Sequence, residues 1–485
     1  MIAEEPAANR AVVTSSPDGL HAAFEEIAGM PEARFSDFFA SNERTNGPTL
    51  HAIFSIPTPP GWIELKVPLD ARRSAFRSLT QRFPALGWYE REIAEQFHVE
   101  VEGHPHLVRL THPADAIPQL AQAPPGVVDY PLGPVRSGVV ESAHYTLRTV
   151  GEELLDCALQ LFYKHRGAEQ RAEGLPLTHA SLIAERISGT SAFNNSLAFL
   201  QAVEAAAEVA VPIRARALRT VFGELERIYN HLGAFADLAQ ATGLAVAQAQ
   251  FEILKERQLR LHALLTGHRY LFGTNVAGGL ACDLDAAQIA GVRDACRTLR
   301  ESLQPLEAMY FSTPSHVDRL VGTGILSHED ALLFGAVGPI GRAAGVDRDA
   351  RREHPYAGYA DVDFAVPLES AGDAMARARV RFSELHESIR IVEQICDRVP
   401  SGEIRVEGVS PSPGSTGFGW AESAHGETLA WIAIGDDGTL RRYRARPASY
   451  ANWQAFSVAI PGHNILTDFP VIEQSFNLSV AGADR

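Results

Sequence analysis

The sequence has 485 residues, 46% of them hydrophobic, so it can bury a large core and hold roughly two to four domains. Its formal net charge of -16 opposes binding to a phosphate backbone, and we expect no nucleic-acid partner. No apolar run approaches the roughly 20 residues of a membrane-spanning helix, and the opening MIAEEPAANR lacks the pattern of a secretion signal. These features predict a cytoplasmic protein, with a peripheral place on the inner face of the cell membrane left open.

The first region, residues 1–112, contains two strand-like runs at 51–56 and 62–67, separated by the turn-rich PTPPG. This pattern predicts an antiparallel hairpin in a small α/β domain. Prolines then cluster within residues 113–130 and the regular periodicity disappears, which indicates a linker.

The remaining region, 131–485, is predicted to be mainly α-helical with a small β-sheet. Apolar residues recur every three or four positions within 213–239 and 375–396, as in helices that pack one face on a core. The runs 429–434 and 440–447 flank the turn GDDGT and predict a β-hairpin, because Asp-Gly supplies the positive φ of a tight turn. The predicted fold class is α+β.

Residues 88–110, WYEREIAEQFHVEVEGHPHLVRL, resemble the signature of the complex I 30 kDa subunit family, approximately W-x-E-R-E-x-x-D-x-F-G-I-x-F-x-G-H-P-x-L. The matched positions are Trp88, Glu90, Arg91, Glu92, Phe97, Gly103, His104, Pro105 and Leu107. Glu95 stands where Asp is usual and His98 where Gly is usual. Both differences concern the local turn geometry rather than the family assignment.

From about residue 130 onward, the chain resembles the family of the complex I 49 kDa subunit and the membrane-bound nickel-iron hydrogenase large subunits. Seven segments follow that family in order and spacing, among them GPVRSGVVESAHYTLRTVGE, AERISGTSAFNNSLAFLQAVE and RARPASYANW. The fusion of both families in one chain resembles the large subunits of hydrogenase-4 and formate hydrogenlyase. The resemblance implies a 30 kDa-like domain at 1–112 and a hydrogenase-large-subunit-like domain at 131–485.

In the hydrogenases, two CxxC pairs supply four thiolates to the nickel-iron centre. Alignment places these cysteines on Ser188, Ser191, Ser479 and Gly482. Hydroxyl groups and a glycine hydrogen cannot replace soft thiolate ligands at nickel, so we expect no metal and no hydrogen chemistry. The four cysteines of the chain are far apart and are expected to be buried apolar residues in a reducing compartment; they are Cys157, Cys282, Cys296 and Cys396.

Complex I has the same fold without the metal, and its vacated cavity is the head of a quinone pocket. The resemblance therefore implies a possible quinone site here. Its expected polar lining is Arg136, His144, Ser188, Gly189, Ser191, Asn194 and Asn195. His144 or His165 could donate a proton, although a histidine that serves only the fold is an equal alternative for each.

Acidic and basic residues at family positions form a second candidate group. Glu141 and Glu169 lie close to the expected cavity, and the family's terminal Asp-Arg pair is kept as Asp484 and Arg485. Buried carboxylates with shifted pKa values often act in proton relays, but an ion pair with Arg485 would give the same pattern. Both interpretations remain open, and His144, Arg136, Glu169, Asp484 and Arg485 are the candidate catalytic residues.

The resemblance implies a subunit of a membrane-associated complex of the NADH:quinone oxidoreductase type, which binds NAD and quinone and moves ions. The implied partners are a small iron-sulfur electron-transfer subunit, a ferredoxin-like subunit and membrane ion-translocating subunits. The iron-sulfur cluster is expected in a partner, because this chain has no cysteine set to hold one. The alternative is a noncatalytic subunit that links a membrane transporter to soluble partners. A hydrogenase with unusual ligands is the weakest alternative.

Overall fold

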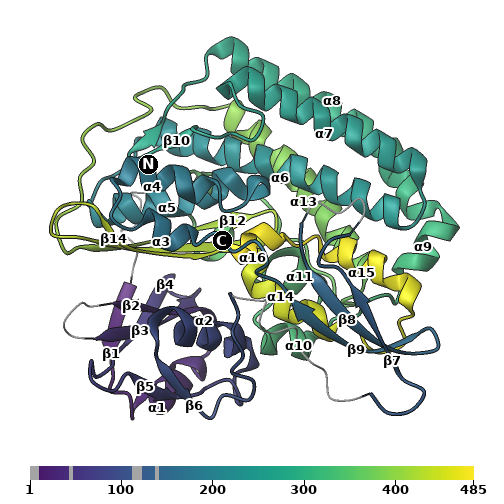
Figure 1. Cartoon of the computed structure of the whole chain (residues 1–485). Coiled ribbons are helices and arrows are strands. Elements are labelled where there is room, and N and C mark those ends of the chain that lie inside the picture. The colour runs from purple at the N-terminus through teal and green to yellow at the C-terminus, as the bar shows by residue number, and fades with distance from the viewer. Residues whose placement is uncertain (1–9, 43–46, 112–122, 137–140) are drawn as a thin grey trace.

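The structure is a computed structural model that describes residues 10–42, 47–111, 123–136 and 141–485. It combines helices with several small sheets, which confirms the α+β class (Figure 1). Residues 113–122 of the predicted linker, together with residue 112, lie outside the described residues. Strand β7 begins at Val128, so the last three positions of the predicted linker are strand.

The N-terminal domain is built on a four-stranded sheet in the order β1-β4-β3-β2. Its elements are β1 (Arg10–Thr14), α1 (Leu20–Ala28), β2 (Arg34–Asn42), β3 (Pro48–Ile56), β4 (Gly61–Pro68), β5 (Ala75–Arg77), α2 (Gly87–Phe97) and β6 (Glu100–Glu102). Strands β3 and β4 are antiparallel neighbours, which confirms the predicted hairpin. Helix α2 is followed by His98, whose left-handed φ of 54° explains why glycine is usual at this position of the family signature.

The second domain begins with a three-stranded sheet and continues through a helical layer to a second three-stranded sheet. Its strands are β7 (Val128–Leu132), β8 (His144–Val150), β9 (Glu153–Gln160), β10 (Asn275–Val276), β11 (Gly279–Leu280), β12 (Thr416–Ser423), β13 (Gly426–Ile434) and β14 (Leu440–Arg446). The α-helices before the last sheet are α3 (Ala168–Ala172), α4 (Leu177–Glu185), α5 (Ala192–Ala206), α6 (Ile213–Ala241), α7 (Ala245–Thr266), α8 (Ala286–Ser312), α9 (Pro314–Leu320), α10 (His328–Leu333), α11 (Gly338–Ala343), α12 (Ala350–Glu353) and α13 (Ala374–Cys396). Those after it are α14 (Ala448–Val458), α15 (Phe469–Phe476) and α16 (Val480–Asp484).

Helices α6 and α13 form the centre of the helical layer, and α7 and α8 cover them on the outside (Figure 1). Both central helices coincide with the periodic segments of the sequence, and nearly every turn of α6 is buried. On the other side, α5 lies directly on β12. A Cβ at Gly417 or Gly419 would stand 1.8 Å or 2.2 Å from a backbone oxygen of α5, so both glycines are required for this close approach.

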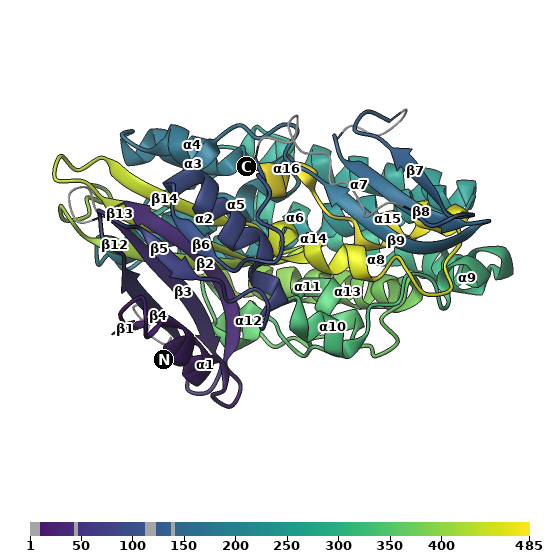
Figure 2. The same cartoon turned by 60° about the horizontal axis from the view of Figure 1, so that its bottom comes forward.

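The two domains share apolar cores rather than touching only through a linker. Phe54 of β3 belongs to the same buried cluster as Tyr145 and Phe456 of the second domain. Trp62 of β4 packs on Trp420 with ring centroids 5.4 Å apart. The N-terminal sheet accordingly lies beside the β12–β14 sheet in both views (Figures 1 and 2). None of the helices formed by the described residues is sufficiently long and apolar to cross a membrane.

Candidate functional site

The serines at two of the expected metal-ligand positions meet in the structure. Ser188 Oγ lies 3.2 Å from Ser479 Oγ, although 291 positions separate the two residues in the sequence. Ser188 precedes the short turn that leads into α5, and Ser479 is the N-cap of α16, where its hydroxyl accepts the N–H of Gly482 at 3.0 Å. Gly482, the fourth aligned position, thus stands next to Ser479 at the same place.

The remaining aligned position, Ser191, contacts a histidine that no motif of the sequence indicates. Its hydroxyl lies 3.3 Å from Nδ1 of His425, in the turn between β12 and β13. Burial, together with the positive charges of Arg381 and Arg227, lowers the pKa of His425 to about 3. The imidazole is therefore neutral at pH 7 and offers one donor and one acceptor nitrogen.

Glu141 holds α16 in place beside these hydroxyl groups. Its carboxylate accepts the backbone N–H groups of Val480 at 2.6 Å and Ala481 at 2.8 Å, and the Ser479 hydroxyl at 3.3 Å. A carboxylate at the start of a helix is favoured by the free N–H groups there. Glu141 therefore positions the segment that carries Ser479 and Gly482.

Arg136 and His144 do not contact the serines. Arg136 donates to Glu473 of α15 at 2.9 Å and 2.5 Å, and its guanidinium lies over the ring of Tyr145. His144 is buried and contacts Thr146 at 3.4 Å, while its Nδ1 has no partner within the described part of the chain. Residues 137–140, between them, lie outside the described residues. Arg136 thus forms an ion pair with α15 and is not part of the group of serine hydroxyls formed by Ser188, Ser191 and Ser479.

Glu169 and Arg485 form the ion pair that the sequence left as one of two alternatives. Arg485 Nη1 lies 2.8 Å from Glu169, and its Nη2 lies 2.8 Å from Glu92 of the N-terminal domain. Arg444 also contacts Glu92, at 3.0 Å, and Asp37, at 2.8 Å. Arg444 and Arg485 hold the pKa of Glu92 below its usual range despite burial, and Arg442, followed by Arg485 and Arg444, does the same for Glu169. Glu169 is thus an ionised partner of arginines within the second domain, and Glu92 joins the same arginines to the N-terminal domain.

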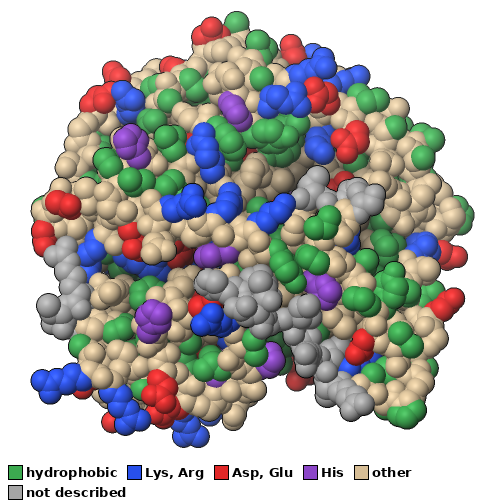
Figure 3. Space-filling model, in the orientation of Figure 1, with side chains coloured by type: hydrophobic (Ala, Val, Ile, Leu, Met, Phe, Trp, Pro, Cys, Tyr) green, Lys and Arg blue, Asp and Glu red, His purple; other side chains and the backbone are tan. Residues whose placement is uncertain are grey.

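Asp484 is buried next to this network. Its carboxyl group accepts the N–H groups of Phe162 at 2.7 Å and Lys164 at 3.1 Å, and its backbone oxygen lies 2.5 Å from His165 Nδ1. Burial raises the pKa of Asp484 to about 7. The side chains of His165 and Arg485 line a cleft of about 990 Å³ between the domains, where the molecule is hollowed in Figure 3.

The start of α5 is held by a buried carboxylate that sequence reasoning missed. Glu226 of α6 accepts the N–H groups of Phe193 at 2.7 Å and Asn194 at 3.1 Å, and the side-chain amide of Asn194 at 2.7 Å. Asn195 is 2% exposed, and both polar atoms of its side chain lack a partner among the described residues. Gly189 lies in the turn between Ser188 and Ser191 and is exposed.

A nickel-iron centre does not fit the groups that this place offers. Three of its four aligned ligand positions carry neutral serine hydroxyl groups where soft thiolates are needed, and the fourth is a glycine. Within the described ranges, no group of three or more His, Cys, Asp or Glu side chains is placed to hold a metal ion. Cys157, Cys296 and Cys396 are buried, and burial raises their pKa values well above that of an exposed thiol.

Comparison with known proteins places these features in a family. The family described as "Respiratory-chain NADH dehydrogenase, 30 Kd subunit" matches residues 13–133, and "Respiratory-chain NADH dehydrogenase, 49 Kd subunit" matches residues 242–416. Formate hydrogenlyase subunit 5 of Escherichia coli (strain K12) is 31% identical over 452 residues, covering 87% of this chain and 79% of that protein. Hydrogenase-4 component G of the same organism is 29% identical, covering 87% and 78%.

Two further relatives come from respiratory complexes. The fused C/D component of the NADH-quinone oxidoreductase of Bdellovibrio bacteriovorus is 28% identical, covering 82% of this chain and 81% of that protein. One protein in the structure of the membrane-bound sulfane sulfur reductase, an archaeal respiratory membrane complex, superposes with a TM-score of 0.69 at 27% identity, covering 74% of this chain and 98% of the other. The chain therefore belongs to the family of fused 30 kDa and 49 kDa complex I subunits and related hydrogenase-4 and formate hydrogenlyase large subunits, a family of membrane-associated respiratory complexes.

Proposed function

We propose that this chain is the large subunit of a membrane-associated oxidoreductase in which a hydroxyl-lined site for a quinone-like acceptor stands in place of the nickel-iron centre. Electrons reach that site from an iron-sulfur cluster in a small partner subunit. A ferredoxin-like subunit and membrane subunits complete the complex, which takes electrons from NADH or another donor and couples their transfer to ion translocation.

One observation carries this proposal. The positions that align with the metal-binding cysteines of the hydrogenases lie close together here, but they carry no thiolates. Ser188 and Ser479 lie in direct contact, Gly482 donates its N–H to Ser479, and Ser191 contacts His425. The aligned positions therefore lie close together, but their side chains are suited to forming hydrogen bonds and not to coordinating a metal. Hydroxyl groups and a neutral imidazole suit the carbonyl oxygens of a quinone, which accept hydrogen bonds.

A polar ligand would also form hydrogen bonds with the unpaired side-chain groups near the start of α5. Asn195 is buried, yet its amide makes no hydrogen bond to the described residues, and the same is true of Asn194 Oδ1. A buried amide without a partner costs about 1–3 kcal/mol, so such groups usually bind water or a ligand. This supports a hydrogen-bonding occupant close to the serines.

A second candidate is a noncatalytic subunit that links a membrane transporter to soluble partners. The buried ion pairs that join Glu92 of the N-terminal domain to Arg444 and Arg485 favour it, because they make the chain a rigid connection between its two ends. In this role Ser188, Ser191 and Ser479 would only fill the space that the metal centre occupies in the hydrogenases.

The native complex separates these functions when its metals and its activities are measured on one sample. Iron without nickel, no hydrogen-dependent dye reduction, and reduction of a short-chain quinone would support the proposal. Stoichiometric nickel with hydrogen activity would overturn it. A complex with neither metal and with no quinone reduction would establish the linking subunit instead.

A matched pair of variants tests the site itself. Ser191→Ala removes the hydroxyl that faces His425, and we expect KM for the quinone to rise roughly 2- to 10-fold, the value of one hydrogen bond. Ser181→Ala is the control, because among the described residues the exposed Ser181 hydroxyl donates to the carbonyl of Thr178 within α4 and to no other group. Equal KM values for the two variants would place the acceptor elsewhere.

A further inference from the structure

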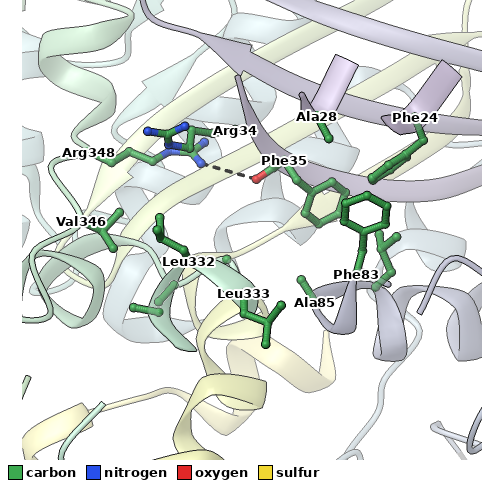
Figure 4. A pocket seen from close by; sticks show the side chains of 14 residues that line it. Phe24, Ala28, Arg34, Phe35, Phe83, Ala85, Leu332, Leu333, Val346 and Arg348 are labelled. Atoms are coloured by element: carbon green, nitrogen blue, oxygen red, sulfur yellow. Dashed lines mark hydrogen bonds between the residues drawn. The ribbon is translucent and has the colours of Figure 1, made fainter. Parts of the chain in front are cut away.

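Neither of the two larger hollows between the domains reaches the serines of the candidate site. One is the cleft of about 990 Å³, and the other, of about 100 Å³, opens between Phe35 and Leu333 (Figure 4). Ser188, Ser191 and Ser479 line neither of them. Ser188 and Ser479 are 4% and 8% exposed, so their side chains have little direct contact with solvent. A proton from solvent therefore has to pass through other groups to reach this site.

One exposed hydroxyl group does contact the site. Thr190 is exposed in the turn that leads into α5, and its Oγ1 lies 2.9 Å from Ser188 Oγ. Ser188 Oγ in turn lies 3.2 Å from Ser479 Oγ. The carbonyl of Thr190 accepts the hydroxyl of Tyr229 at 3.1 Å and the side-chain amide of Asn230 at 2.6 Å, so α6 holds the turn in this position. Thr190, Ser188 and Ser479 thus form a hydroxyl chain from the surface to the interior.

The carboxylate of Glu141 sets the direction of the hydrogen bonds in the hydroxyl chain. A carboxylate only accepts hydrogen bonds, so Ser479 uses its single hydroxyl proton on Glu141, at 3.3 Å. Ser479 therefore accepts from Ser188, and Ser188, whose proton is then used, accepts from Thr190. Every O–H bond of the chain points inward, and the oxygen of Thr190 keeps a lone pair for a water molecule at the surface.

Two other polar groups of the site cannot supply protons in its place. Burial and the positive charge of Arg381 lower the pKa of His425 to about 3, so its imidazole has already lost its acidic proton at pH 7. The amide of Asn195 does not ionise in this range. The protons have to come through hydroxyl or carboxylate groups.

The hydroxyl chain depends on the residues that stand at the aligned cysteine positions. Ser188 and Ser479 occupy two of the four positions. A hydroxyl group donates and accepts hydrogen bonds well, whereas a thiol does both weakly. The same replacement that leaves no thiolate for a metal therefore creates a chain of groups that can pass a proton.

We propose, on the basis of the function proposed above, that Thr190 is the entry point of a proton path that runs through Ser188 and Ser479 to the acceptor. Two electrons from the partner's iron-sulfur cluster and two protons convert the quinone to the quinol. For each proton, an O–H bond forms on the acceptor while the O–H bond of Ser479 breaks. Ser479 regains a proton from Ser188, Ser188 from Thr190, and Thr190 from water. Glu141 is a positioning residue that keeps the chain directed inward.

Steady-state quinone reduction by the native complex tests this inference through variants of Thr190. Thr190→Val removes the hydroxyl at nearly constant volume and leaves the backbone carbonyl that Tyr229 and Asn230 bind. We expect kcat to fall about 10-fold or more while KM for the quinone stays within about 2-fold, because proton transfer is impaired and binding is not. Thr190→Ser restores the hydroxyl and should keep roughly half or more of the native kcat.

The control is Thr298→Val on α8, because the exposed Thr298 hydroxyl donates to the carbonyl of Asp294 within its own helix. It should keep the native kcat and KM. An unchanged kcat in Thr190→Val, as entry of protons at Glu141 would give, would overturn the inference alone. A rise in KM without a fall in kcat, or no recovery in Thr190→Ser, would show a structural role and would also contradict it. If the unsubstituted complex reduces no quinone, the proposed function fails together with this inference.

Discussion

The guanidinium of Arg485 lies 2.8 Å from the carboxylate of Glu92, so α16 is ion-paired to the N-terminal domain. Glu92 also receives Arg444 at 3.0 Å and the hydroxyl of Tyr450 at 2.7 Å. The segment that carries Ser479 and Gly482 is therefore held from two sides, by Glu141 at its start and by Glu92 at its end. The position of the candidate site depends on the N-terminal domain, although none of the aligned ligand positions lies in it.

Removing the charge of Glu92 should destabilise the protein strongly. Glu92→Gln leaves Arg444 and Arg485 buried without their shared carboxylate, and we expect the free energy of unfolding to fall by about 3–5 kcal/mol. Urea unfolding followed by tryptophan fluorescence measures this change. The control is Glu102→Gln, since the Glu102–Arg73 pair is largely exposed and is expected to contribute at most about 1 kcal/mol. Similar losses for both variants would contradict the structural role of Glu92.

Restoring the four thiolates should create a metal site. Cysteines at positions 188, 479 and 482 would converge, because Ser188 and Ser479 already touch and a Cβ at Gly482 would lie 3.4 Å from Ser479 Cβ, an ordinary contact. Position 191 is close as well, since the N–H of Ser191 donates to the carbonyl of Ser188 at 3.2 Å. We expect the quadruple variant to bind about one equivalent of Co²⁺ with a thiolate charge-transfer band, as tetrahedral thiolate sites do. The triple variant that keeps Ser188 is the control and should bind it more weakly. No band in the quadruple variant would mean that the positions do not converge.

Glu226 should make stability depend on pH near neutrality. Burial raises its pKa to about 7, against the lowering effect of the N–H groups that it accepts. Between about pH 4.5 and 7, the folded protein keeps a proton that the unfolded chain has lost, so this group's contribution to stability decreases as the pH rises. Glu226→Gln removes that titration. The stability of the variant, compared with that of the unsubstituted protein at the same pH, should therefore improve from pH 5 to pH 8. Thermal unfolding of both proteins at several pH values measures this difference.

The matched control for this pH effect is Glu256→Gln. Surface pairing with Arg269 and Arg260 lowers the pKa of Glu256 to about 2, so its titration lies below the tested range. Its stability relative to the native protein should therefore not change between pH 5 and pH 8. A parallel response of both variants would show that Glu226 does not titrate in this window.

The contact between α5 and β12 should not tolerate a side chain at either glycine. In Gly417→Ala, the new Cβ would lie 1.8 Å from the backbone oxygen of Ala202, and the helix backbone cannot move away without losing its packing. We expect a loss of about 3 kcal/mol or more, beyond ordinary overpacking. Gly291→Ala on the outer face of α8 meets no atom within 4 Å and should instead stabilise the protein by up to about 1 kcal/mol. Comparison of the two unfolding curves measures the difference.

The sequence predicted the parts of the fold whose signals are local. The periodic segments became α6 and α13, and the runs around PTPPG and GDDGT became the hairpins β3–β4 and β13–β14. Helical periodicity and turn residues act over a few neighbouring positions, so they can be read without knowing the tertiary structure. The family resemblance added the positions of Ser188 and Ser479 in the same way, from short ordered segments.

The candidate site could be predicted only in part. His425 and Glu226 carry no local signal of their roles, because each acts on a residue of another element, Ser191 and Asn194, brought near by packing. Arg136 shows the reverse case, since it was expected at the cavity and pairs instead with Glu473. In each case the partner lies far away in the sequence, so no short-range pattern could identify it.

By itself, the sequence determined the fold class, the fused family and the absence of cysteine at the four aligned positions, because residue type and short-range spacing carry that information. Only the tertiary structure decided that Glu169 is paired with Arg485, that Glu92 joins the two domains, and that a pocket opens between Phe35 and Leu333. Which arginine pairs with which buried carboxylate depends on how elements that are distant in the sequence pack together. That packing depends on all the residues of the core, so no local pattern predicts it.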